Sequence, residues 1–398
     1  MGILSARGPS SPVRVPLTGL PLLIYKLRSG GLPWLAERLR DEWQMPRTRP
    51  GQTLFRAARA LGQSVSRSAQ PEEARSCPEV LYAFYDLGVA PVTFDFLWFL
   101  VGAELERRRR ELTSVHAVIV PGPRRGLRKE PPELERALDV TTRRARIFNM
   151  LVPACTLLPS LSGVTVAGSR AEADRLVRSA GGAVFPARYE PALPIYPGPQ
   201  EPLRAAREER AQVAVLRATA ADLRAVEAWI AARGCDRRVV SITLRGYSYV
   251  PGRNSNIAAW AAFARGLHGT GFSIVIVPDS EQCFTGVPAE LRGLPIFSEA
   301  AVAVGLRMAL YQRAYLNLGV NNGPMGLCWL NEQTRYITFK ILNDGALQTR
   351  AEYMELLGFE SGRSLPFATE WQRWVWAEDE LPIIQDAFND MVARLERA

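Results

Sequence analysis

The sequence predicts an α/β protein made of two Rossmann-like domains with a helical N-terminal appendage. Three features predict this fold class. β-Branched, largely apolar runs alternate with helical stretches, several of these runs end in polar loops, and a proline-rich stretch at residues 185–202 separates an earlier group of such units from a later one. Strands that alternate with helices imply right-handed crossovers and parallel sheets, whose ligands bind beyond the carboxyl ends of the strands.

We divide the chain into four segments. They are the helical N-terminal appendage, residues 1–75; a first Rossmann-like domain, residues 76–200; a second, residues 201–369; and a C-terminal helix, residues 370–398. Short amphipathic helices in the appendage carry Arg38, Arg40, Arg56 and Arg59. Basic amphipathic segments can lie on an anionic membrane surface. A helical hairpin packed on the main body is the alternative.

The composition is that of a folded soluble protein with a positive charge. The 398 residues include 47% hydrophobic and 22% charged residues, and the formal net charge is +9. A positive surface favours anionic partners such as sugar nucleotides, phospholipid headgroups or nucleic acid. The 5 cysteines are scattered and form no CxxC pair. They predict a reducing, cytoplasmic location without a disulfide framework or a zinc site.

The second domain contains the clearest strand signals. Apolar runs at residues 239–244, 272–278, 294–297, 315–320 and 335–339 predict five strands. Polar loops begin at Arg245, Asp279 and Asn321, directly after three of these runs. In a parallel sheet these loops share one edge.

The loop after residue 244 has the features of a phosphate site. Arg245 and Arg253 flank it, and a helix predicted over residues 257–267 follows with Asn254 or Ser255 as its N-cap. The start of a helix favours anions, and a guanidinium can hold two phosphate oxygens. The alternative is that both arginines are solvated loop charges.

The first domain supplies two acidic candidates. A strand is predicted at residues 80–85, and the loop beyond it contains Asp86 and Asp95. Thr93 is the predicted cap of a helix over residues 94–111. Either acid could instead have a structural role, Asp95 as a charge at a helix start. Residues 121–135 are predicted to form a mobile loop.

Several chemistries lack their motifs. The sequence has no GxGxxG after a strand and no GxxxxGK[ST], HExxH or GxSxG. Its only histidines are His116 and His268, which disfavours a histidine-based triad or a multi-histidine metal site.

The chain resembles the GT-B class of glycosyltransferases over roughly residues 79–345. The resemblance is to bacterial heptosyltransferase-like enzymes and, more distantly, to the arginine loop of α1,6-fucosyltransferases. The histidine that often precedes the arginine in the fucosyltransferase loop is Thr243 here. Two short motifs are similar to diphosphate-binding loops: Leu244-Arg245 with Arg253-Asn254-Ser255, and Gly319-Val320-Asn321-Asn322-Gly323-Pro324.

The resemblance implies a role for each matched residue. An acid of the first domain, Asp86 or Asp95, deprotonates the acceptor hydroxyl. The diphosphate is held without a metal or other cofactor. The implied donor-binding residues are Arg245, Arg253, Asn254, Ser255, Asp279, Glu281, Asn321, Asn322 and Gly323.

These observations predict a bacterial glycosyltransferase for a cell-surface polysaccharide. Its partners would be a nucleotide-sugar donor and a glycan or lipid-linked acceptor. The protein itself would be cytoplasmic, with a peripheral contact at the inner face of the membrane. Nucleic-acid binding is disfavoured because the arginines are dispersed. A nucleotide-sugar 2-epimerase and a non-catalytic nucleotide-sugar-binding protein of the same fold are the alternatives.

Overall fold

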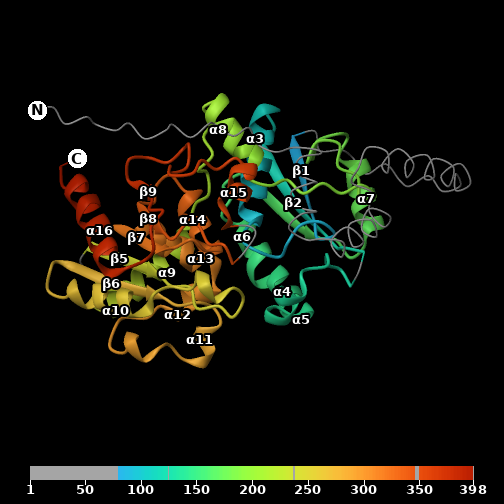
Figure 1. The fold of residues 1–398 in the computed structure, drawn as a ribbon. Helices are drawn as coiled ribbons and strands as arrows, with labels where there is room; N and C mark the ends of the chain where they lie inside the picture. Colours follow the sequence, from blue (N-terminus) through green and yellow to red (C-terminus); the bar gives the residue numbers. More distant parts are fainter. Residues whose placement is uncertain (1–78, 124, 236–237, 346–348, 398) are drawn as a thin grey trace, which may run out of the picture.

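The computed structural model of the chain describes residues 79–123, 125–235, 238–345 and 349–397. The appendage predicted over residues 1–75, including Arg38, Arg40, Arg56 and Arg59, lies outside the described residues. The described residues form two parallel sheets with helices interleaved along the chain (Figure 1). The predicted fold class, α/β with two Rossmann-like halves, is confirmed for this part of the chain.

The sheet of the first half has the strand order β3-β2-β1-β4. From β1 the chain moves to β2 and β3 on one side, and β4 then returns to the other side of β1. The strand order therefore reverses between β1 and β4. The strands are β1 (Val80–Asp86), β2 (Ser114–Val120), β3 (Leu161–Val166) and β4 (Val184–Phe185). The helices are α3 (Phe96–Arg109), α4 (Pro132–Ala137), α5 (Val140–Arg146), the π-helix η1 (Ile147–Leu151), α6 (Val152–Cys155), α7 (Arg170–Ser179) and α8 (Gln200–Glu208).

The sheet of the second half has the order β6-β5-β7-β8-β9, so the strand order reverses between β5 and β7. Its strands are β5 (Arg238–Thr243), β6 (Phe272–Val277), β7 (Leu316–Val320), β8 (Tyr336–Phe339) and β9 (Gln372–Trp374). Its α-helices are α9 (Ala220–Ala232), α10 (Ile257–Gly266), α11 (Gln282–Thr285), α12 (Ser298–Val302), α13 (Val304–Arg313), α14 (Gly326–Trp329), α15 (Ala351–Leu357) and α16 (Leu381–Leu395). Its 3-10 turns are η2 (Pro251–Arg253), η3 (Ala289–Leu291) and η4 (Gly323–Met325).

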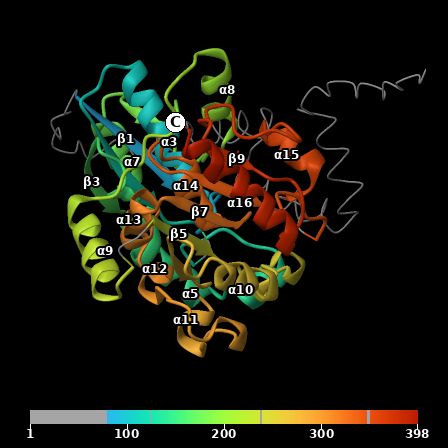
Figure 2. The same ribbon diagram turned by 90° about the vertical axis from the view of Figure 1, so that its left-hand side faces the viewer.

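Both faces of the second sheet are covered. α10 and α16 pack on one face, and α9, α12 and α13 pack on the other (Figure 2). Because both faces are buried, the strands are almost continuously apolar. This pattern made most of these strands predictable from the sequence.

The strand register confirms that the three polar loops share one edge. At the end of β5, Thr243 pairs with Val277 of β6 and with Gly319 of β7. The loops that begin at Arg245, Asp279 and Asn321 therefore leave adjacent strands at the same side of the sheet.

Some predicted elements differ from those observed. Residues 294–297 form no strand, only an isolated bridge between Ile276 and Ile296. The helix predicted over residues 370–398 is correct only from Leu381, because residues 372–374 form β9. Trp374 of this strand packs inward, with its ring 5.1 Å from that of Trp329.

Within the described ranges, no helix is both long and apolar enough to cross a membrane.

One hydrophobic core joins the two halves. Leu97 on α3 and Leu327 on α14 are buried in the same cluster. α15 belongs to the second half, yet Phe359, just beyond it, packs edge-on against Trp98 of α3, with 6.0 Å between ring centroids. The two sheets are therefore held together by buried apolar contacts.

The segment between α8 and α9 connects the halves. Residues 210–219 of this segment are not helical. There the Leu216 amide donates to the Leu330 carbonyl at 2.9 Å, and the Arg217 amide donates to the Leu157 carbonyl at 2.8 Å. The crossover is extended because its backbone bonds to both halves instead of to itself.

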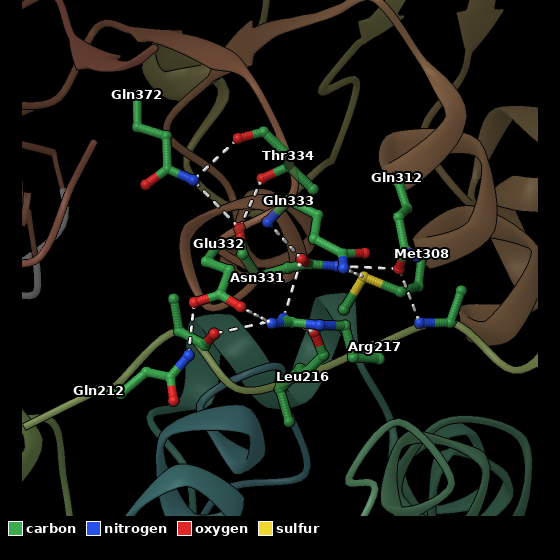
Figure 3. Close-up of polar contacts among 12 residues, drawn as sticks. Gln212, Leu216, Arg217, Met308, Gln312, Asn331, Glu332, Gln333, Thr334 and Gln372 are labelled. Carbon is green, nitrogen blue, oxygen red and sulfur yellow. Dashed lines mark hydrogen bonds and ion pairs between the residues drawn. The ribbon is translucent and has the colours of Figure 1, made fainter. Parts of the chain in front are cut away.

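A buried amide, Asn331, organises this crossover (Figure 3). It is 0% exposed, and its Oδ1 accepts from Arg217 at 3.1 Å and from the Gln333 amide at 2.9 Å. Its Nδ2 donates to Gln312 Oε1 at 3.2 Å, and its carbonyl accepts from Gln372 at 3.1 Å. Each polar atom of this buried side chain is satisfied, which is what makes burial of an amide tolerable.

We predict that Asn331→Ala lowers the free energy of unfolding by about 3 kcal/mol, since it leaves several buried groups without partners. The exposed Asn149 is the matched control, and Asn149→Ala should change stability by less than about 0.5 kcal/mol. Urea denaturation measures both. Equal, small effects would show that the network contributes little.

Candidate functional site

In each sheet the strand order reverses at one point. In parallel α/β sheets, ligands bind beyond the carboxyl ends of the strands at such a point. In the first half this point lies between the loops after β1 and β4, and in the second half between the loops after β5 and β7. The loops after β1 and β7 meet at Gly323, where an added Cβ would lie 3.0 Å from the Phe94 ring. The resemblance implied Gly323 as a donor-binding residue, but the group beside it here is Phe94.

Arg253 lies where the two loops of the second half meet. Its guanidinium donates to the Asn321 carbonyl at 3.1 Å, which is direct evidence that these loops are in contact. Burial and the neighbouring Arg245 lower the pKa of Arg253 to about 10, while Tyr249 and Asp95 act in the opposite direction. The side chain is therefore cationic at neutral pH, in an environment that disfavours its charge.

Arg245 is folded into its own loop. Its side chain is buried and donates to the carbonyls of Tyr249 at 2.5 Å and Val250 at 3.1 Å, and to the side chain of Asn254. Burial lowers its pKa, against the opposing effects of nearby acids. In this conformation, these guanidinium hydrogens are directed at the protein and not at a ligand.

The predicted N-cap of α10 is wrong by one or two positions. Asn256 caps the helix, with its Oδ1 accepting from the Ala259 amide at 3.2 Å. Ser255 instead pairs with Arg245, accepting its amide at 2.9 Å, and Asn254 accepts from the Tyr247 amide at 3.1 Å. Both residues fix the shape of the loop and leave the cap to Asn256.

A carboxylate already lies at the start of α10. Asp379 is 1% exposed and accepts from the Asn256 amide at 2.7 Å and from the Trp260 indole at 2.8 Å. Lys340 lies 3.6 Å from it. Part of the positive end of this helix is therefore satisfied by the protein itself.

The acids after β6 bind the loop after β5. Asp279 accepts from the Gly246 amide at 3.3 Å, and Glu281 accepts from the amide and the hydroxyl of Ser248 at 3.1 and 3.0 Å. The resemblance implied both acids as donor-binding residues. In this structure they accept hydrogen bonds from backbone amides of the loop after β5.

The loop after β7 is internally bonded. The Asn321 side chain donates to the Ile341 carbonyl at 2.7 Å, and Asn322 Oδ1 accepts from the Met325 amide at 3.1 Å. These bonds hold the Asn321 carbonyl next to Arg253.

Asp86 forms a buried ion pair. It is 1% exposed, and both its oxygens receive the Arg170 guanidinium at 2.9 Å. Tyr189 donates at 2.6 Å and the Gly88 amide at 2.8 Å. The side chain is buried and both its oxygens are occupied by donors of the protein, so it is not open to an acceptor hydroxyl and Asp86 has no part in the function proposed below.

Asp95 is exposed at the start of α3, which begins at Phe96, two residues later than predicted. It accepts from the Thr93 hydroxyl at 2.8 Å. Burial raises the pKa of Tyr196 and of Tyr353, and in both cases the Asp95 carboxylate adds to this effect. Tyr353 lies on α15, so residues of both halves surround Asp95.

A cavity of about 600 Å³ opens between the halves. From the first half, α4 contributes to its wall, and from the second half the loop after β5 does. Its lining residues are Glu133, Arg136, Ala137, Ser248, Tyr249, Val250 and Gly345.

The sequence analysis did not identify Arg128 and Tyr196, which interact electrostatically with each other close to Asp95. Residues 121–135 were predicted to be mobile, but Arg128 binds Glu130 at 2.6 and 2.9 Å and the Val89 carbonyl at 3.0 Å. The Arg-x-Glu spacing was the available signal. Tyr196 lies in the proline-rich stretch, where an isolated aromatic residue was the only sign.

Comparisons with known proteins find similarity in structure only. No protein-family model matches the chain, and no curated protein matches it. A family 9 glycosyl transferase from Veillonella parvula DSM 2008 has a TM-score of 0.44 and 11% identity, covering 68% of this chain and 82% of that chain. The ADP-heptose LPS heptosyltransferase II of E. coli has a TM-score of 0.44 and 8% identity, and the match covers 80% of this chain and 99% of that chain. The E. coli heptosyltransferase WaaC, solved with ADP-2-deoxy-2-fluoro heptose, has a TM-score of 0.35 and 12% identity, and the match covers 78% of this chain and 99% of that chain. These proteins are glycosyltransferases, the class that the sequence resembles, and the likeness is one of fold.

We predict opposite consequences for the two first-half acids. Asp86→Asn should lower the free energy of unfolding by about 3 kcal/mol, because it breaks a buried ion pair. Asp95→Asn should change it by less than about 0.5 kcal/mol, because the side chain is exposed. Thermal and urea denaturation test both. A stable Asp86→Asn protein would contradict the structural role of Asp86.

Proposed function

We propose that the chain is a glycosyltransferase that moves a sugar from a nucleotide-sugar donor to a hydroxyl of a glycan or lipid-linked acceptor in this cleft. The observation that carries the proposal is Arg253. It is a partly buried cation beside a second cation, Arg245, at the point where the strand order of the second sheet reverses. A buried charge needs an anionic partner, and a diphosphate in the crevice would supply one.

Asp95 is the proposed general base. It lies in the loop after β1, at the crevice of the first half, and is exposed to a ligand. The acceptor oxygen would form the new bond to the sugar C1 while the bond from C1 to the diphosphate oxygen breaks. The acceptor proton passes to Asp95, and the nucleoside diphosphate leaves with the bonding electrons.

Arg253 is the proposed charge partner of the leaving group. Charge develops on the departing diphosphate in the transition state, and a fixed guanidinium stabilises it there. Because this residue supplies the positive charge, we propose that transfer needs no metal ion. Activity in the presence of EDTA would support that part of the proposal, and loss of activity restored by Mg²⁺ would contradict it.

We predict that one nucleoside diphosphate among those of the U, G, A and C bases stabilises the protein. At about 100 times its Kd, it should add about 2.7 kcal/mol, measured as a rise in Tm. Arg253→Ala should weaken binding about tenfold or more, because the charge and the fork of donors are both lost. Arg253→Lys retains the charge and should lose less affinity.

Arg265→Ala is the matched control, since Arg265 is exposed at the far end of α10 from Arg253. It should leave the shift unchanged. No shift with any nucleotide or nucleotide sugar, ADP-heptose included, would contradict the proposed function. Binding without transfer in an acceptor screen would favour the non-catalytic alternative.

We predict that Asp95→Asn lowers the transfer rate by about 10²- to 10⁴-fold, the usual contribution of a general base. Donor affinity should remain within about twofold, because the residue acts on the acceptor and not on the diphosphate. Steady-state rates and titration calorimetry measure the two quantities. An active Asp95→Asn protein would exclude this residue as the base.

A further inference from the structure

The loop after β5 is held in a closed shape that leaves little for an anion to bind. Arg245 donates to two carbonyls of its own loop and to Asn254. The amides of Gly246 and Ser248 donate to carboxylates. A phosphate in a strand-to-helix loop binds the same kinds of group, namely backbone amides and a guanidinium.

Glu281 makes the most complete of these contacts. One carboxylate oxygen accepts from the Ser248 amide at 3.1 Å, and the other accepts from the Ser248 hydroxyl at 3.0 Å. Two phosphate oxygens would accept the same pair of hydrogen bonds. Glu281 and Asp279 also act on Arg245, where each favours its charged form against burial.

The backbone of the loop is strained in this closed conformation. Val250 has a left-handed conformation, with φ 54 and ψ 71. That region is unfavourable for a β-branched residue. The Val250 carbonyl accepts from Arg245, so the contacts inside the loop hold the strained residue in place.

We propose that Glu281, with Asp279, is an acidic latch that occupies the anion positions of the donor loop until the donor diphosphate displaces it. The latch rests on the proposed function. Displacement frees the amide and hydroxyl of Ser248 and the amide of Gly246 for the phosphates. Two like charges cannot share these donors, so the carboxylate opposes donor binding and sets its affinity.

The test is titration calorimetry of ADP, GDP, UDP, CDP and inorganic pyrophosphate with the full chain and with Glu281→Gln. The glutamine retains the size of the side chain and removes its charge. We expect the nucleoside diphosphate that binds, and pyrophosphate, to have a Kd about fivefold lower in the variant, the usual scale of a coupling between two sites. Glu208→Gln removes the same charge from α8 in the other half and should leave the Kd unchanged.

The outcomes separate the latch from the proposed function. Nucleotide binding that weakens in Glu281→Gln, with pyrophosphate unchanged, would overturn the latch in favour of a ribose contact and leave the proposed function intact. An unchanged Kd for both ligands would also overturn it. Binding seen only in the variant would support it, and no binding to either protein would overturn both proposals.

Hydrogen exchange of the unliganded protein gives a second measurement. If the carboxylate holds the loop, the Ser248 amide should exchange faster in Glu281→Gln than in the parent chain, since a neutral amide oxygen is the weaker acceptor. Equal exchange, with an unchanged melting temperature, would overturn the latch without reference to any ligand.

Discussion

The arrangement of the molecule depends on how the crossover between the halves satisfies its backbone. Residues 210–219 lie between two sheets and cannot pair with themselves, so each polar group there needs a partner from one half or the other. Asn331 meets this need by linking Arg217 to Gln312 and, through its own carbonyl, to the side chain of Gln372 in β9. Because the same crossover bonds to Leu157 in the first half, it fixes the position of one crevice relative to the other.

The charged groups near the loop after β5 differ in how completely they are paired. Several charged groups around the loop after β5 already have partners: Asp379 lies at the start of α10, and Asp279 and Glu281 contact the loop. Arg253 differs, because its guanidinium donates to a neutral group, the Asn321 carbonyl. This difference, more than the number of arginines, makes Arg253 the candidate contact for an anion.

The sequence predicted what depends on long apolar runs and missed what depends on tertiary contacts. β5, β6 and β7 were predictable because each is buried on both faces, whereas β4 and β9 have only two and three residues. Three polar residues in a row could each cap α10, and only the contacts of Asn254 and Ser255 with the loop leave Asn256 for that role. Likewise Asp86 and Asp95 share a loop, and the position of Arg170, 84 residues away, separates their roles.

The single core that both halves share has a consequence for motion. Many two-domain enzymes open and close by rotating one domain about a hinge. Here Leu97, Leu327 and Met354 belong to one buried cluster, and Phe94 lies against Gly323. A rotation large enough to admit a substrate would expose that cluster to water at a cost of about 25 cal/mol per Å² of apolar surface. If the proposed activity holds, ligand entry and release depend on rearrangement of short loops at the rim, on the faster timescale of loop motion.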